Sequence, residues 1–364
     1  MAQIKKRGLG WSVRLQWRDA TGKRHTSSKS GFKTKCLAQV WAVEHEARLN
    51  AGVAIDKTIS LTNYFRQWVD TYKRPKLSRV SLERYDHLAV LIDKYFGQTP
   101  IKEITRPQYQ QFINQYGRQH APSSVQKTNG FIRACVKSAI LDDYLTKDFT
   151  QNVTLTANKS RTVEVEYLNR QEIKLLIKEA YHHLDPNYTS RYMIITAIYT
   201  GMRKEEIQAL TWKDINFSSN TIKITKAYDE RSHNFKATKN PSSVRTIKAN
   251  AELLKILSDL KHHTTSTMVF LNCLGTIPTS NALNKELRKL LKQAHIDKRG
   301  FHFHSLRHSH VALLLAKGID IYAISKRLGH NNITTTVNTY SYLMDEYRVK
   351  VDQEIISALA DLDH

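Results

Sequence analysis

Residues 301–340 read FHFHSLRHSHVALLLAKGIDIYAISKRLGHNNITTTVNTY and are the most informative part of the chain. His304 and Arg307 stand three residues apart, which places both side chains on one face of a predicted helix. Residues 328–330 (LGH) end a second predicted helix, because glycine commonly follows a helix C-terminus. Tyr340 comes ten residues later. The stretch therefore combines imidazole, guanidinium and phenol groups around two helices.

Two further clusters lie upstream. Residues 200–210 (TGMRKEEIQAL) place a glycine directly before a basic helix start that contains Arg203. Residues 237–247 (ATKNPSSVRTI) place Lys239 in a turn that leads into a strand. Each fragment alone is a weak signal, but four of them in order across about 140 residues are specific.

In motif, order and spacing the four clusters resemble the tyrosine recombinase family, in particular its phage-integrase type. The resemblance implies that Tyr340 is the nucleophile that attacks a DNA phosphodiester, with Tyr342 as a distant second choice. It also implies that Lys239 protonates the leaving 5′-hydroxyl, with Lys236 as the fallback because alignment can slip in this long connection. A phenol has an ordinary pKa of about 10, so such a nucleophile needs nearby cations and a base.

The remaining members of the expected catalytic set handle charge. Arginine binds non-bridging phosphate oxygens through a planar donor fork, so Arg203 and Arg307 are expected to clamp the charge that develops on the phosphate. The resemblance assigns phosphate hydrogen bonding and proton handling to His304 and His330, and Glu206 is expected to orient Arg203. A 3′-phosphotyrosine bond would conserve the phosphodiester energy, so no cofactor, ATP or catalytic metal is expected; the chain has no GxxxxGK[ST] motif.

Three of these features have alternative interpretations. A metal site could use four histidines, although no cysteine or carboxylate stands at ligand spacing from them: His302, His304, His308 and His310. Arg203 and Arg245 could be surface ion-pair residues, and Arg245 is expected to support the hairpin that contains Lys239. Residues 321–340 also look like the helix-turn-helix of a DNA-binding regulator without catalysis. A regulator has no need of Arg203, Lys239 and the His304/Arg307 pair together, which favours the recombinase.

Residues 1–57 predict a small β-sheet with one helix. Apolar residues alternate with polar ones in a strand, at Trp11, Val13, Leu15 and Trp17. A second strand is expected at 23–28 and a helix at 34–50. By resemblance this is an arm-type DNA-binding domain with a three-stranded sheet; a protein-binding domain is the alternative. The candidate DNA contacts are Arg14, Trp17, Lys23 and Arg24.

Residues 58–155 predict a helical domain, which the resemblance implies is the core-binding domain. Amphipathic spacing indicates helices from Leu61, at 81–96, from Thr105 and at 123–145. Their aromatic side chains are expected to form the core, and Arg79 and Arg84 are the candidate DNA contacts. The polar stretch 151–162 is interpreted as an interdomain linker.

Residues 163–364 contain all four clusters, so the resemblance implies that they form the catalytic domain. Helices are expected at 171–181 and 191–199, with Asn169 as an N-cap, and short strands at 221–225 and 244–247. The fold class is therefore α+β and mainly helical, with a mixed α/β catalytic domain. An amphipathic stretch at 351–362 is expected to dock either on a neighbouring subunit or on its own domain.

Composition points to a polyanionic partner. The 364 residues include 56 Lys and Arg against 33 Asp and Glu, a net charge of +23. The excess is spread as +8 over residues 1–57, +8 over 58–162 and +7 over 163–364, which favours folded units that all face nucleic acid. No apolar run approaches a membrane span, and the three cysteines are too far apart to suggest a disulfide framework.

The resemblance, which extends to the N-terminal segment, implies an integrase of a phage or other mobile element. It would act in the bacterial cytoplasm, on core and arm DNA sites. The resemblance implies a homotetramer on two DNA duplexes and leaves room for an excisionase and a host DNA-bending protein.

Overall fold

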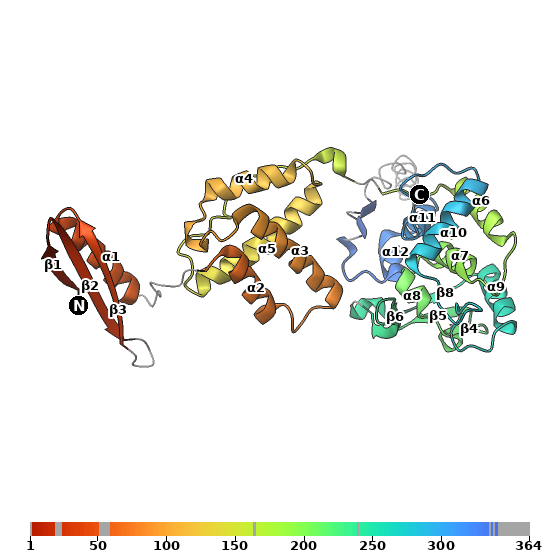
Figure 1. The fold of residues 1–364 in the computed structure, drawn as a ribbon. Coiled ribbons are helices and arrows are strands. Elements are labelled where there is room, and N and C mark those ends of the chain that lie inside the picture. Colours follow the sequence, from red (N-terminus) through yellow and green to blue (C-terminus); the bar gives the residue numbers. More distant parts are fainter. Residues whose placement is uncertain are drawn as a thin grey trace, which may run out of the picture. The chain divides into compact units, whose positions relative to one another are not determined.

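The computed structural model describes residues 2–18, 24–50, 59–162, 165–238, 240–334, 336–337 and 339–340. The chain divides into two compact units, Met1–Val163 and Glu164–His364 (Figure 1). The first contains a β-sheet and a set of helices, and the second contains helices with two small sheets. The expected α+β, mainly helical fold is confirmed. In the described part of the chain, no helix is long and apolar enough to cross a bilayer.

The N-terminal sheet is antiparallel, in the order β1-β2-β3. Its elements are β1 (Gln3–Arg7), β2 (Gly10–Arg18), β3 (Arg24–Phe32) and the helix α1 (Lys35–Asn50). The alternation of β2 buries Val13 and Leu15 against Ala38 and Ala42 of α1. The expected strand over 11–17 and the helix are confirmed. Strand β1 is nearly all exposed and carries no apolar alternation, so only the three-stranded sheet of the resemblance indicated it.

The helical part of the first unit has the aromatic core that the sequence predicts. Its elements are α2 (Leu61–Tyr72), α3 (Arg79–Phe96), the short 3₁₀ turn η1 (Ile101–Glu103), α4 (Arg106–Gly117) and α5 (Pro122–Leu141). Thr105 and Gln108 form a capping box that starts α4. Helix α5 ends four residues before the expected 145, because Asp143 adopts a left-handed conformation and Leu145 turns back to the Ala139 carbonyl.

The stretch 151–162 is packed more closely than the expected linker. Gln110 of α4 exchanges two hydrogen bonds of 2.8 Å with the backbone of Thr154. A Cβ on Gly117 would lie 1.9 Å from the Thr156 carbonyl oxygen, so the segment runs directly against α4. The segment contains the 3₁₀ turn η2 (Lys159–Arg161). Its polar side chains attach it through hydrogen bonds, which apolar periodicity does not reveal.

The second unit carries the four predicted clusters. Its helices are α6 (Arg170–Tyr181), α7 (Ser190–Thr200), α8 (Lys204–Gln208), α9 (Ala251–His262), α10 (Ser280–Gln293), α11 (Ser305–Leu315) and α12 (Ile321–Leu328), with 3₁₀ turns η3 (Trp212–Asp214) and η4 (Pro241–Ser243). Helix α7 is buried around most of its circumference and packs against α6, α9, α10 and α11. Asn169 forms the expected cap of α6, reciprocally with Glu172.

Two small sheets accompany these helices. The first has the order β4-β5-β8, from β4 (Ile215–Asn216), β5 (Thr221–Ile224) and β8 (Arg245–Lys248). Both expected strands are confirmed, and Ile222 pairs with Ile247 across them. The second is a hairpin of β6 (Lys226–Asp229) and β7 (Asn234–Ala237), in the connection where the pattern showed only a polar, lysine-rich segment.

Candidate active site

A glycine turn between α7 and α8 places Arg203. Gly201 ends α7 with φ +65°, in the left-handed region that favours glycine. Arg203 then occupies the N-cap position of α8. Its backbone N–H donates to Glu206 Oε2 at 2.9 Å and its Nη1 donates to Glu206 Oε1 at 2.8 Å. The side chain of Arg203 is thereby oriented while part of it stays accessible, with 26% of its surface exposed.

Glu206 joins two arginines. Its carboxylate is only 3% exposed and also accepts hydrogen bonds from both terminal nitrogens of Arg245, at 3.1 and 2.9 Å. Burial by itself would raise the pKa of Glu206, but the hydrogen bonds and charges of Arg245 and Arg203 hold it below its ordinary value. Glu206 is therefore ionised. Glu206 contacts Arg203, as its expected orienting role requires, and that role stays a prediction. The expected support of the hairpin by Arg245 also stays a prediction, because these contacts join Arg245 to Glu206.

Arg307 lies on α11 and is almost completely buried. Its Nη1 donates to the Gly201 carbonyl at 2.6 Å, and its Nη2 donates to the Leu328 carbonyl at 2.8 Å. Burial and the positive charge of Arg203 lower the pKa of Arg307 to about 9. The guanidinium thus stays charged at neutral pH and is fixed between the ends of α7 and α12.

His330, just after α12, completes this arrangement. Its Nε2 lies 2.8 Å from Arg307 Nη2, and its Nδ1 lies 2.6 Å from Thr336 Oγ1. Arginine can only donate, so Nε2 is the acceptor and the imidazole proton sits on Nδ1. Burial and the charge of Arg307 lower the pKa of His330 to about 4, so the ring is neutral at pH 7.

His304 and His308 lie one helical turn apart at the start of α11. Their ring centroids are 5.2 Å apart. His304 is at the surface; loss of solvation and the charge of Arg307 lower its pKa to about 4. The pKa of His308 is also lowered to about 4, by burial and by His304. Both imidazoles are therefore neutral at pH 7 and able to accept a proton.

Tyr340 is buried beside α11. It is 1% exposed and packs in a cluster with Val311 and Leu328. Its hydroxyl lies 2.8 Å from Nδ1 of His308. The sequence-predicted nucleophile therefore shares one region with Arg307 and the histidines, but its hydroxyl must become exposed before it can meet a DNA phosphate.

The hairpin that leads to Lys239 is anchored at its turn. Glu230 accepts hydrogen bonds from Lys204 Nζ at 2.6 Å and from the backbone N–H of Ser280 at 3.0 Å. Lys236, the alternative lysine, donates to Asp229 Oδ2 across the hairpin at 3.3 Å. Lys239 itself lies outside the described residues, as do Tyr342, Lys23 and the stretch 351–362.

The other candidate DNA contacts lie in the first unit. Four arginines are exposed, on β2, β3 and α3: Arg14, Arg24, Arg79 and Arg84. Arg24 donates to Gln16 at 2.8 Å, and Trp17 stacks on His25 with ring centroids 5.6 Å apart. The four arginines face solvent, as a DNA contact requires, whereas Trp17 is half-buried. Contact of these side chains with DNA stays a prediction.

Several residues at the site were assigned no role from the sequence. His308, which touches Tyr340, shares the face of His304 through i,i+4 spacing, and that spacing could have indicated it. Thr336 and Arg327 gave no local signal. The metal interpretation is not supported: among the described residues, no three His, Cys, Asp or Glu side chains form a metal-holding group.

Comparison with known proteins covers all three segments. Residues 166–346 match the model of the phage integrase family, residues 3–49 match an arm DNA-binding domain, and residues 60–116 match the N-terminal SAM-like domain of phage integrases. An integrase of Staphylococcus phage L54a is 25% identical over 285 residues, covering 70% of this chain and 80% of the relative. A XerC-like tyrosine recombinase of Caldanaerobacter subterraneus subsp. tengcongensis is 24% identical over 368 residues, covering 91% of both chains.

Solved structures show the same fold. The Tn1549 transposon integrase, in complex with a circular intermediate DNA, superimposes with a TM-score of 0.69 at 18% identity, covering 81% of this chain and 99% of that one. A lambda integrase tetramer bound to a Holliday junction gives 0.59 at 16% identity, covering 91% and 96%. With its catalytic, arm-binding and SAM-like matches, the chain belongs to the phage integrase family of tyrosine recombinases, enzymes that cut and rejoin DNA in site-specific recombination.

Proposed function

We propose that this recombinase integrates and excises a phage or other mobile element, with Tyr340 as the nucleophile. The observation that carries the residue assignment is the convergence of Arg203, Arg307 and His330 around the Gly201 turn, with the Tyr340 hydroxyl held on the adjoining face of α11. These contacts support the assignment of Arg203, Arg307 and His330 to one site.

The proposed step exchanges one phosphate ester for another. The Tyr340 oxygen forms a bond to phosphorus while the bond between phosphorus and the 5′-oxygen breaks. The phenol proton passes to an imidazole; His308 touches this hydroxyl, and His304 lies one turn away. Lys239 supplies the proton that the leaving 5′-oxygen takes. Rejoining reverses each transfer.

Arg203 and Arg307 act on the charge of the phosphate. Both bind the non-bridging oxygens as these gain charge in the pentavalent transition state, where fixed donors in a water-poor site are most effective. Glu206 neutralises part of the local positive charge while leaving donor groups of Arg203 available. Arg245 braces Glu206 from the other side.

The three segments of the chain are proposed to have different roles on the DNA. Residues 1–57 would bind arm-type sites, residues 58–155 would clamp the core site, and residues 163–364 would carry out catalysis. The match of 3–49 to an arm DNA-binding domain supports the first assignment. The lambda integrase tetramer on a Holliday junction supports a homotetramer on DNA.

A mobile element is supported by the relatives. Besides the phage L54a integrase, the ICEBs1 integrase of Bacillus subtilis is 31% identical over 161 residues, covering 40% of this chain and 43% of that one. An excisionase and a host DNA-bending protein would then set the direction of recombination in the bacterial cytoplasm.

A covalent trap tests the nucleophile. The full chain is incubated, in EDTA, with labelled DNA from the region flanking its own gene and run on a denaturing gel. A protein–DNA adduct is expected from the wild type and from Tyr322→Phe, an exposed tyrosine on α12. Tyr340→Phe should give no adduct while binding DNA with the same affinity, because it lacks only the attacking oxygen.

Two results would contradict this assignment. An adduct that survives in Tyr340→Phe would show that another residue is the nucleophile. Tight, specific binding by the wild type without any adduct would favour the DNA-binding regulator instead.

A further inference from the structure

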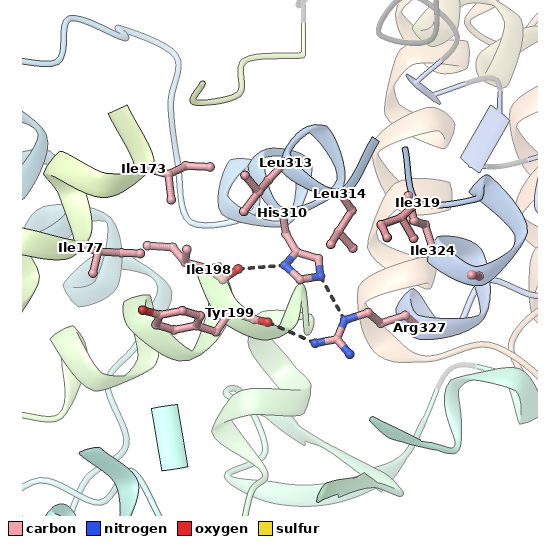
Figure 2. A pocket seen from close by; sticks show the side chains of 11 residues that line it. Ile173, Ile177, Ile198, Tyr199, His310, Leu313, Leu314, Ile319, Ile324 and Arg327 are labelled. Atoms are coloured by element: carbon pink, nitrogen blue, oxygen red, sulfur yellow. Dashed lines mark hydrogen bonds between the residues drawn. The ribbon is translucent and has the colours of Figure 1, made fainter. Parts of the chain in front are cut away.

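The last turn of α12 carries a half-buried guanidinium, that of Arg327, which connects four elements. Arg327 lines a cavity of about 340 Å³ together with Tyr199, His310 and apolar side chains of α6, α7, α11, α12 and the connection before α12 (Figure 2). Its Nε donates to His310 Nε2 at 3.2 Å, its Nη2 to the Tyr199 carbonyl at 3.2 Å, and its Nη1 to the Lys248 carbonyl at 3.1 Å. These three acceptors lie on α11, α7 and the end of β8, and all are neutral.

One path leads from this guanidinium to Arg307. His310 accepts at Nε2, so its proton sits on Nδ1 and is donated to the Ile198 carbonyl at 2.9 Å (Figure 2). The ring so fixed lies against the backbone of Gly201, where a Cβ would come within 2.6 Å of His310 Cδ2. The carbonyl of Gly201 is the acceptor for Arg307 Nη1. His310 therefore sets the position of the backbone that holds Arg307.

A second path leads to Arg203. The backbone carbonyl of Arg327 accepts a hydrogen bond from Arg245 Nε at 2.6 Å. Arg245 donates both terminal nitrogens to Glu206, and Glu206 in turn holds Arg203. The guanidinium of Arg327 fixes the end of α12, and with it this carbonyl. Both paths thus start from one residue and end on the two arginines proposed to clamp the phosphate.

We infer that Arg327, acting with His310, is a positioning residue of the recombination reaction that fixes Arg203 and Arg307 relative to each other. This inference rests on the proposed role of those arginines in transition-state binding. Misplacing a catalytic group by about 1 Å can slow a reaction about 100-fold, so a positioning residue outside the substrate contact has a large kinetic effect.

The test compares Arg327→Met with Lys326→Met in the full chain. Methionine keeps most of the side-chain length and removes one positive charge in both variants. Lys326 is the control because its side chain lies over the ring of Tyr322 and belongs to neither path described above. DNA affinity is measured at one salt concentration. The rate of single-turnover cleavage is measured on DNA that carries either the natural phosphodiester or a methylphosphonate at the scissile position. The methylphosphonate has a methyl group in place of a charged non-bridging oxygen, so the rate of its cleavage depends less on the arginines.

For Arg327→Met we expect cleavage of the phosphodiester to slow by about 10- to 100-fold with DNA affinity within about twofold of the wild type. The defect should shrink markedly on the methylphosphonate, a change that general loss of stability would not produce. Lys326→Met should cleave both substrates at close to the wild-type rate. His310→Gln should reproduce the Arg327→Met pattern in a weaker form.

Equal defects on both substrates, or equal defects in Arg327→Met and Lys326→Met, would overturn the inference. If Arg327→Met does not fold, Arg327→Lys is judged by the same comparison, since it keeps the charge and loses the three-way fork. Failure of the nucleophile assignment is separate, because it would appear as cleavage by Tyr340→Phe whatever the outcome at Arg327.

Discussion

At the scale of single residues, the site depends on how its positive charges are balanced. Arg203, Arg245 and Arg307 lie close enough for their charges to influence one another, and Glu206 is the carboxylate that contacts two of them. Because Glu206 is nearly fully buried, its attraction to the arginines is little weakened by water. Removing one partner of such a buried group leaves an uncompensated buried charge. This lowers the free energy of unfolding by more than the loss of an exposed ion pair does.

Glu206→Gln should therefore lower the free energy of unfolding of the second unit by about 3 kcal/mol and slow DNA cleavage. The control is Glu205→Gln: Glu205 is the preceding residue, 43% exposed, and pairs with Lys204 at 3.5 Å. That change should stay within about 0.5 kcal/mol of the wild type. Denaturant unfolding at pH 7 makes the comparison. Equal losses in the two variants would show that the charge of Glu206 contributes no more to stability than the charge of Glu205 does.

At the scale of elements, the catalytic groups stand where helices end. Helices α7 and α12 both stop at a glycine in the left-handed region, Gly201 and Gly329, and the turns that follow deliver Arg203 and His330. Each glycine also permits close approach: a Cβ on Gly329 would lie 2.9 Å from Arg245 Nη1. The two glycines therefore end their helices and also leave room for neighbouring side chains to approach the backbone.

Gly201→Ala and Gly318→Ala separate these two functions. Gly318 has φ +71° but no atom within 4 Å of an added Cβ, so alanine there should cost only backbone strain, about 1 kcal/mol. At Gly201 the same strain is joined by the clash with His310, so a loss at least about 2 kcal/mol greater is expected, with slower cleavage. Denaturant unfolding and single-turnover cleavage provide the two readouts. Similar losses at both positions would mean that the His310 contact adds nothing.

At the scale of the whole molecule, positive charge is spread over all three segments. The N-terminal residues 1–57 alone contribute +8 of the total +23. Binding to a polyanion releases counterions from each phosphate that is neutralised, so its salt dependence reports how many phosphates are contacted. A segment that binds arm sites adds to this number only on DNA that carries such sites.

Deletion of residues 1–57 should abolish binding to distal sites and flatten the slope of log affinity against log salt, by about 0.9 for each phosphate that the shortened chain no longer neutralises. The control is DNA with the core site alone, on which the deletion should change the slope much less. Fluorescence anisotropy over a salt series gives both slopes. An unchanged slope on DNA with distal sites would argue against an arm-binding role.

Prediction from sequence succeeded where a pattern is local and strong. The alternation around Val13 and Leu15, the capping box at Asn169 and the pairing strands that contain Ile222 and Ile247 were all expected and observed. It was less successful for the hairpin β6–β7, whose strand β7 is fully exposed, and for the segment 151–162, where side-chain hydrogen bonds replace apolar periodicity. The catalytic candidates came from the order and spacing of four clusters, a signal that depends on the family resemblance.

The amino-acid sequence by itself determined the class of fold, most helices, and the set of arginines, histidines and tyrosine that define the family. Only the tertiary structure decided that Glu206 is shared by two arginines, that His308 holds a buried Tyr340, and that Arg327 reaches α7, α11 and β8 at once. The physical reason is separation along the chain. Helix and strand patterns depend on neighbours a few residues apart, whereas Arg327 and the Tyr199 carbonyl are 128 residues apart and meet only in the packed tertiary structure.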